Sequence, residues 1–145
     1  MSPAALRRVL ACGVALLAWD AAAANFGRQN YIQYCAGCHQ MDGSGSPENG
    51  VPGIKEVAGH FLRLPEGRAY LVQVPGVSQA FLSDYQVAEL LNWMLDAMSK
   101  AAQPSGFQAY TADEVRRLRA TKLQDVFGTR RGIVEQLRGM GYAVD

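Results

Sequence analysis

The chain has 145 residues, of which 49% are hydrophobic and 19% are charged, and its formal net charge is +1. A chain of this length and apolar content can bury the core of one small domain, and its composition is not that of a disordered protein. Such an even charge balance gives no support to nucleic-acid binding, which needs a concentrated basic face. We therefore expect one folded domain with some additional chain.

The N-terminus has the three parts of a secretory signal peptide. Arg7 and Arg8 are the basic part, an apolar run follows over residues 9–19, and four alanines end the segment. A membrane-spanning helix needs roughly 20 apolar residues, and Asp20 interrupts this run at about half that length. We predict that residues 1–24 are a cleaved signal peptide, that the mature chain has no membrane span, and that the protein works in the periplasm.

The two cysteines beyond this segment stand in one short motif, Cys35-Ala36-Gly37-Cys38-His39. Cys-x-x-Cys-His is the attachment signature of c-type haem. The two thiols add across the two vinyl groups on one porphyrin edge, and the histidine that follows is then placed beneath the iron as an axial ligand. We predict one haem c, attached covalently through Cys35 and Cys38, with its iron bound by His39.

Three other uses of a cysteine pair fit the sequence less well. A disulfide across two intervening residues closes a tiny loop and adds little stability. A thioredoxin-type redox pair needs a βαβ domain around it, of which the sequence shows no sign. A zinc site needs a fourth ligand, for which only His60 or an acidic residue remains. The histidine directly after the second cysteine favours haem attachment.

Two predicted helices lie on either side of this motif in the sequence. The first runs over residues 25–40 into the motif and places Gly27 and Tyr31, four residues apart, on one face. The second has Ser83 as its N-cap and carries apolar residues at helical spacing as far as Met98. Both helices therefore have an apolar face to bury.

With these features the chain resembles class I cytochrome c, a family of monohaem c-type cytochromes. In that family a glycine and an aromatic residue on the first helix pack against an aliphatic and an aromatic residue, three apart, on the last. Gly27 and Tyr31 match the first pair, and Leu90 and Trp93 match the second. The resemblance covers residues 25–98 and implies an all-α fold, a small cytochrome c-like haem domain with a helical C-terminal extension.

The resemblance also implies how the haem is surrounded. In the family a proline carbonyl accepts a hydrogen bond from the second ring nitrogen of the proximal histidine. Pro52, in a turn-rich segment, is the matching residue, and its alternative role is to stiffen the loop. Arg63 and Arg68 are expected either to pair with the haem propionates or to be solvated surface charges. The residues expected to line the haem are Leu62, Leu64, Tyr70, Leu71, Val72 and Trp93.

The family's usual distal methionine is missing. It normally lies shortly before the last helix, and here residues 71–81 contain none. Beyond the signal segment, methionine occurs only at positions 41, 94, 98 and 140. Met41 is two residues from His39, a span of about 7 Å that cannot reach the opposite haem face, and core packing accounts for the two methionines of the last helix. The sixth iron position is therefore open, or it is filled by His60 or a methionine.

The chain after the last haem-domain helix is basic, whereas the haem part is acidic. Residues 25–99 carry four basic and seven acidic side chains, and residues 100–145 carry eight and five. We predict that the first range is the haem domain and the second a helical extension, with a capping box at residues 111–114 and a last helix over residues 123–138. The first extension helix is expected to turn Val115 and Leu118 inward and Arg116, Arg117 and Arg119 outward. Its apolar stripe either docks on the haem domain or binds a partner.

The function that the resemblance implies is electron transfer rather than catalysis. A periplasmic monohaem cytochrome carries single electrons between redox proteins, such as a periplasmic dehydrogenase as donor and a cytochrome or an oxidase as acceptor. The alternative is an open-site haem protein that binds a diatomic gas or has peroxidase-like activity, with His60 and Arg63 as distal groups. No further catalytic group is apparent in the sequence.

Overall fold

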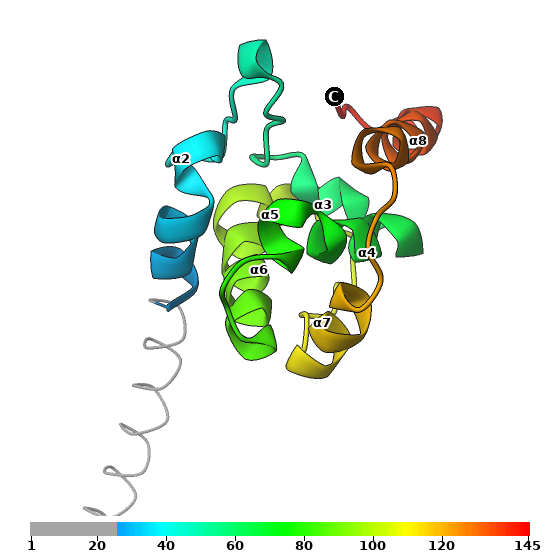
Figure 1. Cartoon of the computed structure of the whole chain (residues 1–145). Helices are drawn as coiled ribbons and strands as arrows, with labels where there is room; N and C mark the ends of the chain where they lie inside the picture. The colour runs from blue at the N-terminus through cyan, green and yellow to red at the C-terminus, as the bar shows by residue number, and fades with distance from the viewer. Residues whose placement is uncertain (1–25) are drawn as a thin grey trace, which may run out of the picture.

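The computed structural model describes residues 26–145, so the predicted signal peptide over residues 1–24 lies outside the described residues. Within the described range the secondary structure is helical, apart from one isolated β-bridge between Ser46 and Val51. This confirms the predicted all-α fold (Figure 1). In the same range, no helix combines the length and apolar character that a membrane crossing requires.

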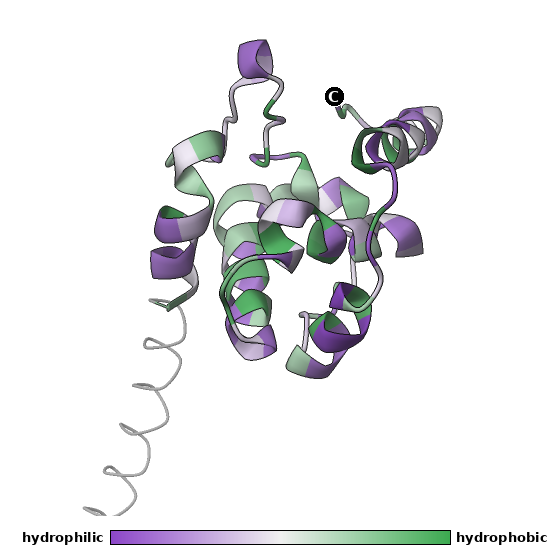
Figure 2. Ribbon diagram, viewed as in Figure 1, coloured by the Kyte–Doolittle hydropathy of each residue, from purple (hydrophilic) through white to green (hydrophobic). Residues whose placement is uncertain are grey.

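The helices follow one another with short connections. A helix over residues 26–34 leads into α2 (Ala36–His39), and the remaining helices in chain order are η1 (Pro47–Asn49), α3 (Ala58–Phe61), α4 (Pro65–Gln73), α5 (Pro75–Ser78), α6 (Asp84–Ser99), η2 (Lys100–Ala102), α7 (Ala112–Arg119) and α8 (Val126–Gly139). Figure 1 shows the N-terminal helix and α2 on one side of α6, and α7 and α8 on the other side of the molecule. In Figure 2 the ribbon of α6 alternates between hydrophobic and hydrophilic residues, as expected for a helix that buries one face.

The first helix is not continuous over residues 25–40, as the sequence predicted. It stops at a turn formed by Cys35, whose φ is −124°, and α2 then ends at Gln40, whose φ of 65° lies in the left-handed region. A non-glycine residue rarely adopts this conformation without a stabilising contact. Here the Tyr31 hydroxyl donates a hydrogen bond of 2.7 Å to the Gln40 carbonyl. The haem motif therefore forms a separate helical turn.

The predicted crossing of the first and last haem-domain helices is confirmed. A Cβ atom added to Gly27 would lie 2.5 Å from Trp93 Cβ and 2.7 Å from the Glu89 carbonyl oxygen, so only glycine permits this approach. The Tyr31 side chain is fully buried, and its ring centroid lies 5.5 Å from that of Trp93. Leu90, the fourth residue of the predicted set, is buried in the same core cluster.

The N-cap of α6, Ser83, is the one that the sequence predicted, whereas α4 and α5 were not predicted. The Ser83 hydroxyl accepts a hydrogen bond from the Gln86 amide, and the Gln86 side chain accepts one from the Ser83 amide, which completes a capping box. Both α4 and α5 begin with a proline, Pro65 and Pro75, at a position where a missing amide proton costs nothing. These prolines were the signal that marked the two helices.

Residues 100–145, which the sequence predicted to be a helical extension, pack on the rest of the protein, so the docked alternative holds in this structure. Val115 of α7 and Tyr110 belong to the main core cluster with α6 residues. A second cluster joins α8 to α3 and α4, and its buried members are Phe61, Tyr70, Ile133, Val134, Leu137 and Val144. Tyr70 was expected to line the haem, but its side chain lies in this second cluster because α8 covers that face of α4.

Arg68 anchors the extension and is neither a propionate ligand nor a solvated charge, so that expectation was wrong. Its guanidinium donates to both carboxylate oxygens of Glu114, at 2.6 and 2.7 Å, and to the Gln108 carbonyl at 2.9 Å. It also lies 4.1 Å above the Tyr110 ring. Because Arg68 takes the Glu114 carboxylate, only the Thr111 half of the predicted capping box forms.

The Arg68–Glu114 pair predicts an acid-dependent loss of stability. The hydrogen bond from Arg68 lowers the pKa of the Glu114 carboxyl below its ordinary 4.5. A depressed folded-state pKa means that the contribution is complete above pH 4.5 and is lost as the pH falls through the folded value. In urea unfolding, the wild type should therefore have a higher free energy of unfolding than Glu114→Gln, and this difference should become smaller below pH 4.5. Asp113→Asn, which removes an exposed ion pair on the same helix, should have almost the same free energy of unfolding as the wild type. A difference between wild type and Glu114→Gln that does not change with pH would contradict the pairing.

Candidate functional site

The two cysteines of the motif lie on one helical turn with free thiols. The Cys38 and His39 amides both donate to the Cys35 carbonyl, at 3.1 and 2.9 Å, and this turn brings the three side chains of the motif together. Burial, and then the proximity of Cys38, raise the pKa of Cys35 to about 11. The Cys35 thiol is therefore protonated at neutral pH, unlike the reactive thiolate of a thioredoxin-type pair.

The ring of His39 is oriented by a backbone carbonyl, as predicted. Its Nδ1 atom lies 3.0 Å from the carbonyl oxygen of Pro52. A carbonyl only accepts hydrogen bonds, so Nδ1 carries the proton and Nε2 keeps its lone pair. Burial lowers the pKa of His39 more than this hydrogen bond raises it, so the imidazole stays neutral. A neutral imidazole with a free Nε2 is the form that binds a metal ion.

A glycine-rich loop brings the Pro52 carbonyl to this histidine. The Gly45 amide donates to the His39 carbonyl at 2.9 Å, and the bridge between Ser46 and Val51 folds the loop back on itself. Gly45 has a φ of 74°, and a Cβ atom added there would lie 2.6 Å from the Pro52 carbonyl oxygen. Only glycine satisfies both the backbone conformation and this close approach. The loop therefore positions the hydrogen-bond acceptor through its backbone.

An apolar wall lies beside Cys35. It borders a small depression whose lining residues are Tyr34, Cys35, Gly76, Val77, Ala80, Leu82, Val87 and Leu90. These residues come from the N-terminal helix, α5, α6 and the segment between α5 and α6, so distant parts of the chain meet at the cysteine. An apolar wall, two free thiols and a neutral imidazole with an available nitrogen fit the requirements of a covalently attached haem. Among the described residues, no three His, Cys, Asp or Glu side chains cluster as a zinc site would require.

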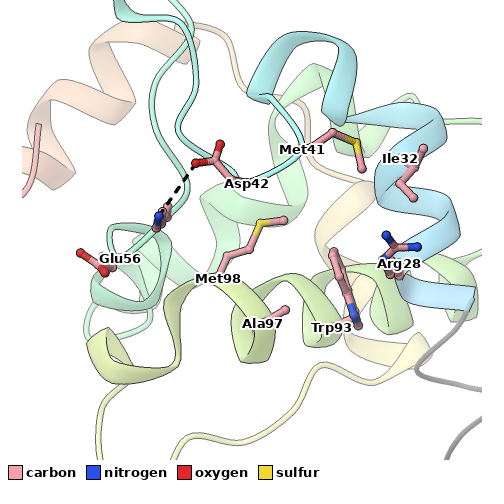
Figure 3. Close-up of a pocket in the computed structure, with 9 residues that line it drawn as sticks. Arg28, Ile32, Met41, Asp42, Glu56, Trp93, Ala97 and Met98 are labelled. Atoms are coloured by element: carbon pink, nitrogen blue, oxygen red, sulfur yellow. Dashed lines mark ion pairs between the residues drawn. The ribbon is translucent and has the colours of Figure 1, made fainter.

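Two of the methionines face a different hollow. Met41 and Met98 line a hollow of about 370 Å³ together with Trp93, and Figure 3 shows them on opposite sides of it. The dashed line in the figure marks the ion pair between Asp42 and Lys55, at 3.9 Å. No residue of the Cys-x-x-Cys-His motif is among the lining residues of this hollow. In this structure the two methionines therefore lie in a hollow that the motif does not share.

The other two methionines and the second histidine are also engaged elsewhere or exposed. Met94 is buried in the main core cluster, and the Met140 side chain at the end of α8 is 53% exposed. The His60 ring lies 4.9 Å from the Tyr142 ring of the extension, and Arg63 lies 4.3 Å above the same ring. Burial, and then the charge of Arg63, lower the pKa of His60. The two residues considered as a peroxidase-like pair therefore both contact the extension.

The sequence predicted the wrong orientation for one residue beside the site and did not assign it a role there. Arg119 was expected to point outward, but its side chain is only 17% exposed and its guanidinium binds Asp84 and neighbouring carbonyls before α6. A signal was available, because Arg119 follows the buried Val115 by four residues and so shares its helix face. A charged residue on an apolar face points to buried acceptors rather than to solvent.

Comparison with known proteins agrees with this arrangement. No family model matches the sequence. Two relatives, both named cytochrome c-552, come from Thermus thermophilus, the second of them from a designated strain of that organism. Each alignment has 36% identity over 118 residues, and it covers 67% of this chain and 86% and 76% of the respective relatives. The chain belongs to the class I c-type cytochromes and is a monohaem electron carrier with covalently attached haem c, not an enzyme.

Proposed function

We propose that Cys35 and Cys38 form the two thioether bonds to haem c and that Nε2 of His39 is the proximal iron ligand. The observation that carries this proposal is the 3.0 Å contact between His39 Nδ1 and the Pro52 carbonyl, one turn from two free thiols. When bound, haem c supplies a ferric–ferrous couple that accepts and releases one electron. The protein supplies attachment, orientation and an environment for that couple.

Each group at the site has a distinct part in this role. Pro52 holds the His39 ring in one tautomer and one orientation, so the imidazole need not reorient when the charge changes. The Cys35 thiol, protonated at neutral pH, is available for addition to a vinyl group. Val77 and Leu82 on the apolar wall exclude water from the side of Cys35. Together these residues favour fast, reversible transfer of single electrons.

The place and partners of the protein follow from the sequence features. We propose that residues 1–24 direct export and are removed, and that the protein works in the periplasm with residues 25–99 as haem domain and residues 100–145 as extension. Its partners are redox proteins, and we propose a periplasmic dehydrogenase as donor and a cytochrome or oxidase as acceptor. Residues 25–99 carry more acidic than basic side chains and residues 100–145 the reverse, and such charge differences influence which partners associate.

Covalent attachment is tested by mass spectrometry of the exported protein. After acid–acetone extraction, the wild-type chain should weigh one haem more than its polypeptide. Cys35→Ala or Cys38→Ala should weaken haem retention, and the double variant should abolish covalent attachment. Met41→Ala, which changes an exposed side chain two residues beyond the motif, should keep the full haem mass. A wild-type mass equal to that of the bare polypeptide would refute the proposed attachment.

A second candidate role, binding of a diatomic gas, is favoured by one observation on the apolar wall beside Cys35. Of the described residues that line the apolar wall, only Cys35 and Tyr34 carry an atom that ligates iron, and the Tyr34 hydroxyl donates to the Phe81 carbonyl at 3.3 Å. The segment before α6 therefore offers no methionine or histidine to the iron. We propose that the iron has no methionine ligand.

The oxidised protein should then lack the weak long-wavelength band that methionine–iron bonding gives in class I cytochromes, and its midpoint potential should lie below that family's usual range. With an open site, the ferrous protein should bind carbon monoxide readily. With His60 as ligand, binding should be slow and become fast in His60→Ala. A methionine band that disappears in Met94→Ala, Met98→Ala or Met140→Ala would overturn this prediction and leave the electron-transfer role intact.

A further inference from the structure

Arg119, the last residue of α7, makes four polar contacts with one short segment of the haem domain. Its Nε atom donates to the Ser78 carbonyl at 3.1 Å, and Nη2 donates to the Ala80 carbonyl at 3.0 Å. Nη1 donates both to the Leu82 carbonyl at 3.0 Å and to the Asp84 carboxylate at 2.9 Å. A single side chain thus uses most of its five N–H donors on the loop that connects α5 to α6.

This loop, taken with the last residue of α5 and the first of α6 as residues 78–84, has one side chain packed against the main core cluster, the partly buried Leu82. Its largest side chain, Phe81, is 97% exposed and so contributes no buried apolar anchor. Within the loop the local backbone hydrogen bonds are short-range, from the Ala80 amide to the Val77 carbonyl and from the Leu82 amide to the Ala80 carbonyl. A segment with few buried contacts opens locally at low free-energy cost. The contacts of Arg119 therefore add a long-range polar hold to the packing of Leu82.

The inner side of the same loop faces the proposed haem attachment site. Ala80 and Leu82 line the depression beside Cys35, and the Phe81 carbonyl accepts a hydrogen bond from Tyr34, the residue before that cysteine. The loop is thus held on one side by the extension and on the other by the N-terminal helix. A displacement of the loop away from Cys35 would open the apolar wall to water.

We propose that Arg119 is a positioning residue for the haem, which makes the C-terminal extension a working part of the haem site. Arg119 sets the distance between the 78–84 loop and Cys35, and through it the solvent exposure of the haem. The inference rests on the proposed attachment of haem at Cys35. Water near a haem favours the more charged ferric state, so release of the loop lowers the midpoint potential.

The geometry requires arginine and not merely a positive charge. The acceptors of Arg119 are spread over three carbonyls and one carboxylate, and a planar guanidinium reaches them in several directions at once. A lysine ammonium is a compact point charge with three donors, and it cannot span the same set. Arg119→Lys should therefore keep the ion pair with Asp84 and lose part of the hold on the loop.

The test uses the full, haem-loaded protein and three variants. Arg119→Ala removes the contacts, Arg119→Lys retains the charge, and Arg116→Ala removes an equal charge from the same helix. The last is a matched control, because among residues 26–145 the only ion-pair partner of Arg116 is Asp113, in an exposed pair at 2.8 Å. Two quantities are measured: hydrogen–deuterium exchange of the amides in the 78–84 loop, and the midpoint potential of the haem.

In Arg119→Ala, loop exchange should rise about tenfold or more, which corresponds to the loss of hydrogen bonds to a charged group, and the midpoint potential should fall. Arg119→Lys should lie between Arg119→Ala and wild type, and Arg116→Ala should match wild type in both measurements. If Arg119→Ala does not fold, Arg119→Lys decides alone. Unchanged loop exchange, or faster exchange with an unchanged potential, would overturn the inference.

These outcomes are distinct from a failure of the proposed function. A wild-type chain without covalent haem would contradict the attachment at Cys35 and Cys38. A haem-loaded Arg119→Ala protein with the wild-type potential would contradict the positioning role alone.

Discussion

Replacing Gly27 by alanine should destabilise the haem-loaded protein by about 3 kcal/mol, at the upper end of the range for overpacked cores. The added Cβ atom would lie 2.5 Å from Trp93 Cβ and 2.7 Å from the Glu89 carbonyl oxygen. Both atoms belong to the helical framework of α6, so no rotamer change relieves the contact. The two helices must move apart, which also disturbs the packing of the buried Tyr31 ring against Trp93. Urea unfolding followed by circular dichroism measures the loss.

The matched control is Gly132→Ala, a glycine-to-alanine change in the middle of α8. A Cβ atom there meets no other atom within 4 Å. Because alanine has the higher helix propensity, this variant should be about 0.5–1 kcal/mol more stable than wild type. A Gly27→Ala protein as stable as wild type would show that the N-terminal helix does not contact α6 as the structure has it.

Replacing Leu137 by alanine should release α8 from the haem domain. The Leu137 side chain is fully buried in the cluster that joins α8 to α3 and α4. Truncating a fully buried leucine costs about 3 kcal/mol. The lost contacts are those that hold α8 against α3 and α4. Limited proteolysis should therefore cut residues 126–139 much faster in Leu137→Ala than in wild type, with the haem domain intact.

Phe127→Ala on the same helix is the control, because the Phe127 side chain is 72% exposed and its loss removes little buried contact. Its α8 should resist the protease as wild type does. If wild-type α8 were cut as fast as that of Leu137→Ala, the helix would not be docked in the isolated protein, and the extension would then be a partner-binding arm.

Features that depend on neighbours along the chain could be predicted from the sequence. Cys35, Cys38 and His39 lie within one helical turn, so the chemistry that needs all three can be read from their spacing alone. The helical period likewise identified the buried face of Gly27 and Tyr31, which a single glycine allows to approach α6 closely. Local periodicity decides which face of a helix is apolar before any partner is known.

The pairing of distant groups, by contrast, became visible only in the folded molecule. Arg68 and Glu114 are 46 residues apart, and Arg119 lies 35 residues from Asp84. Nothing local to Arg68 shows whether its charge meets a propionate, a carboxylate or water. The sequence also could not place Tyr70 against α8, since that contact exists only once the extension has docked. The partner of a side chain is decided by long-range packing. The spacing of apolar residues shows which face of a helix is buried, but it does not show which distant residue that face meets.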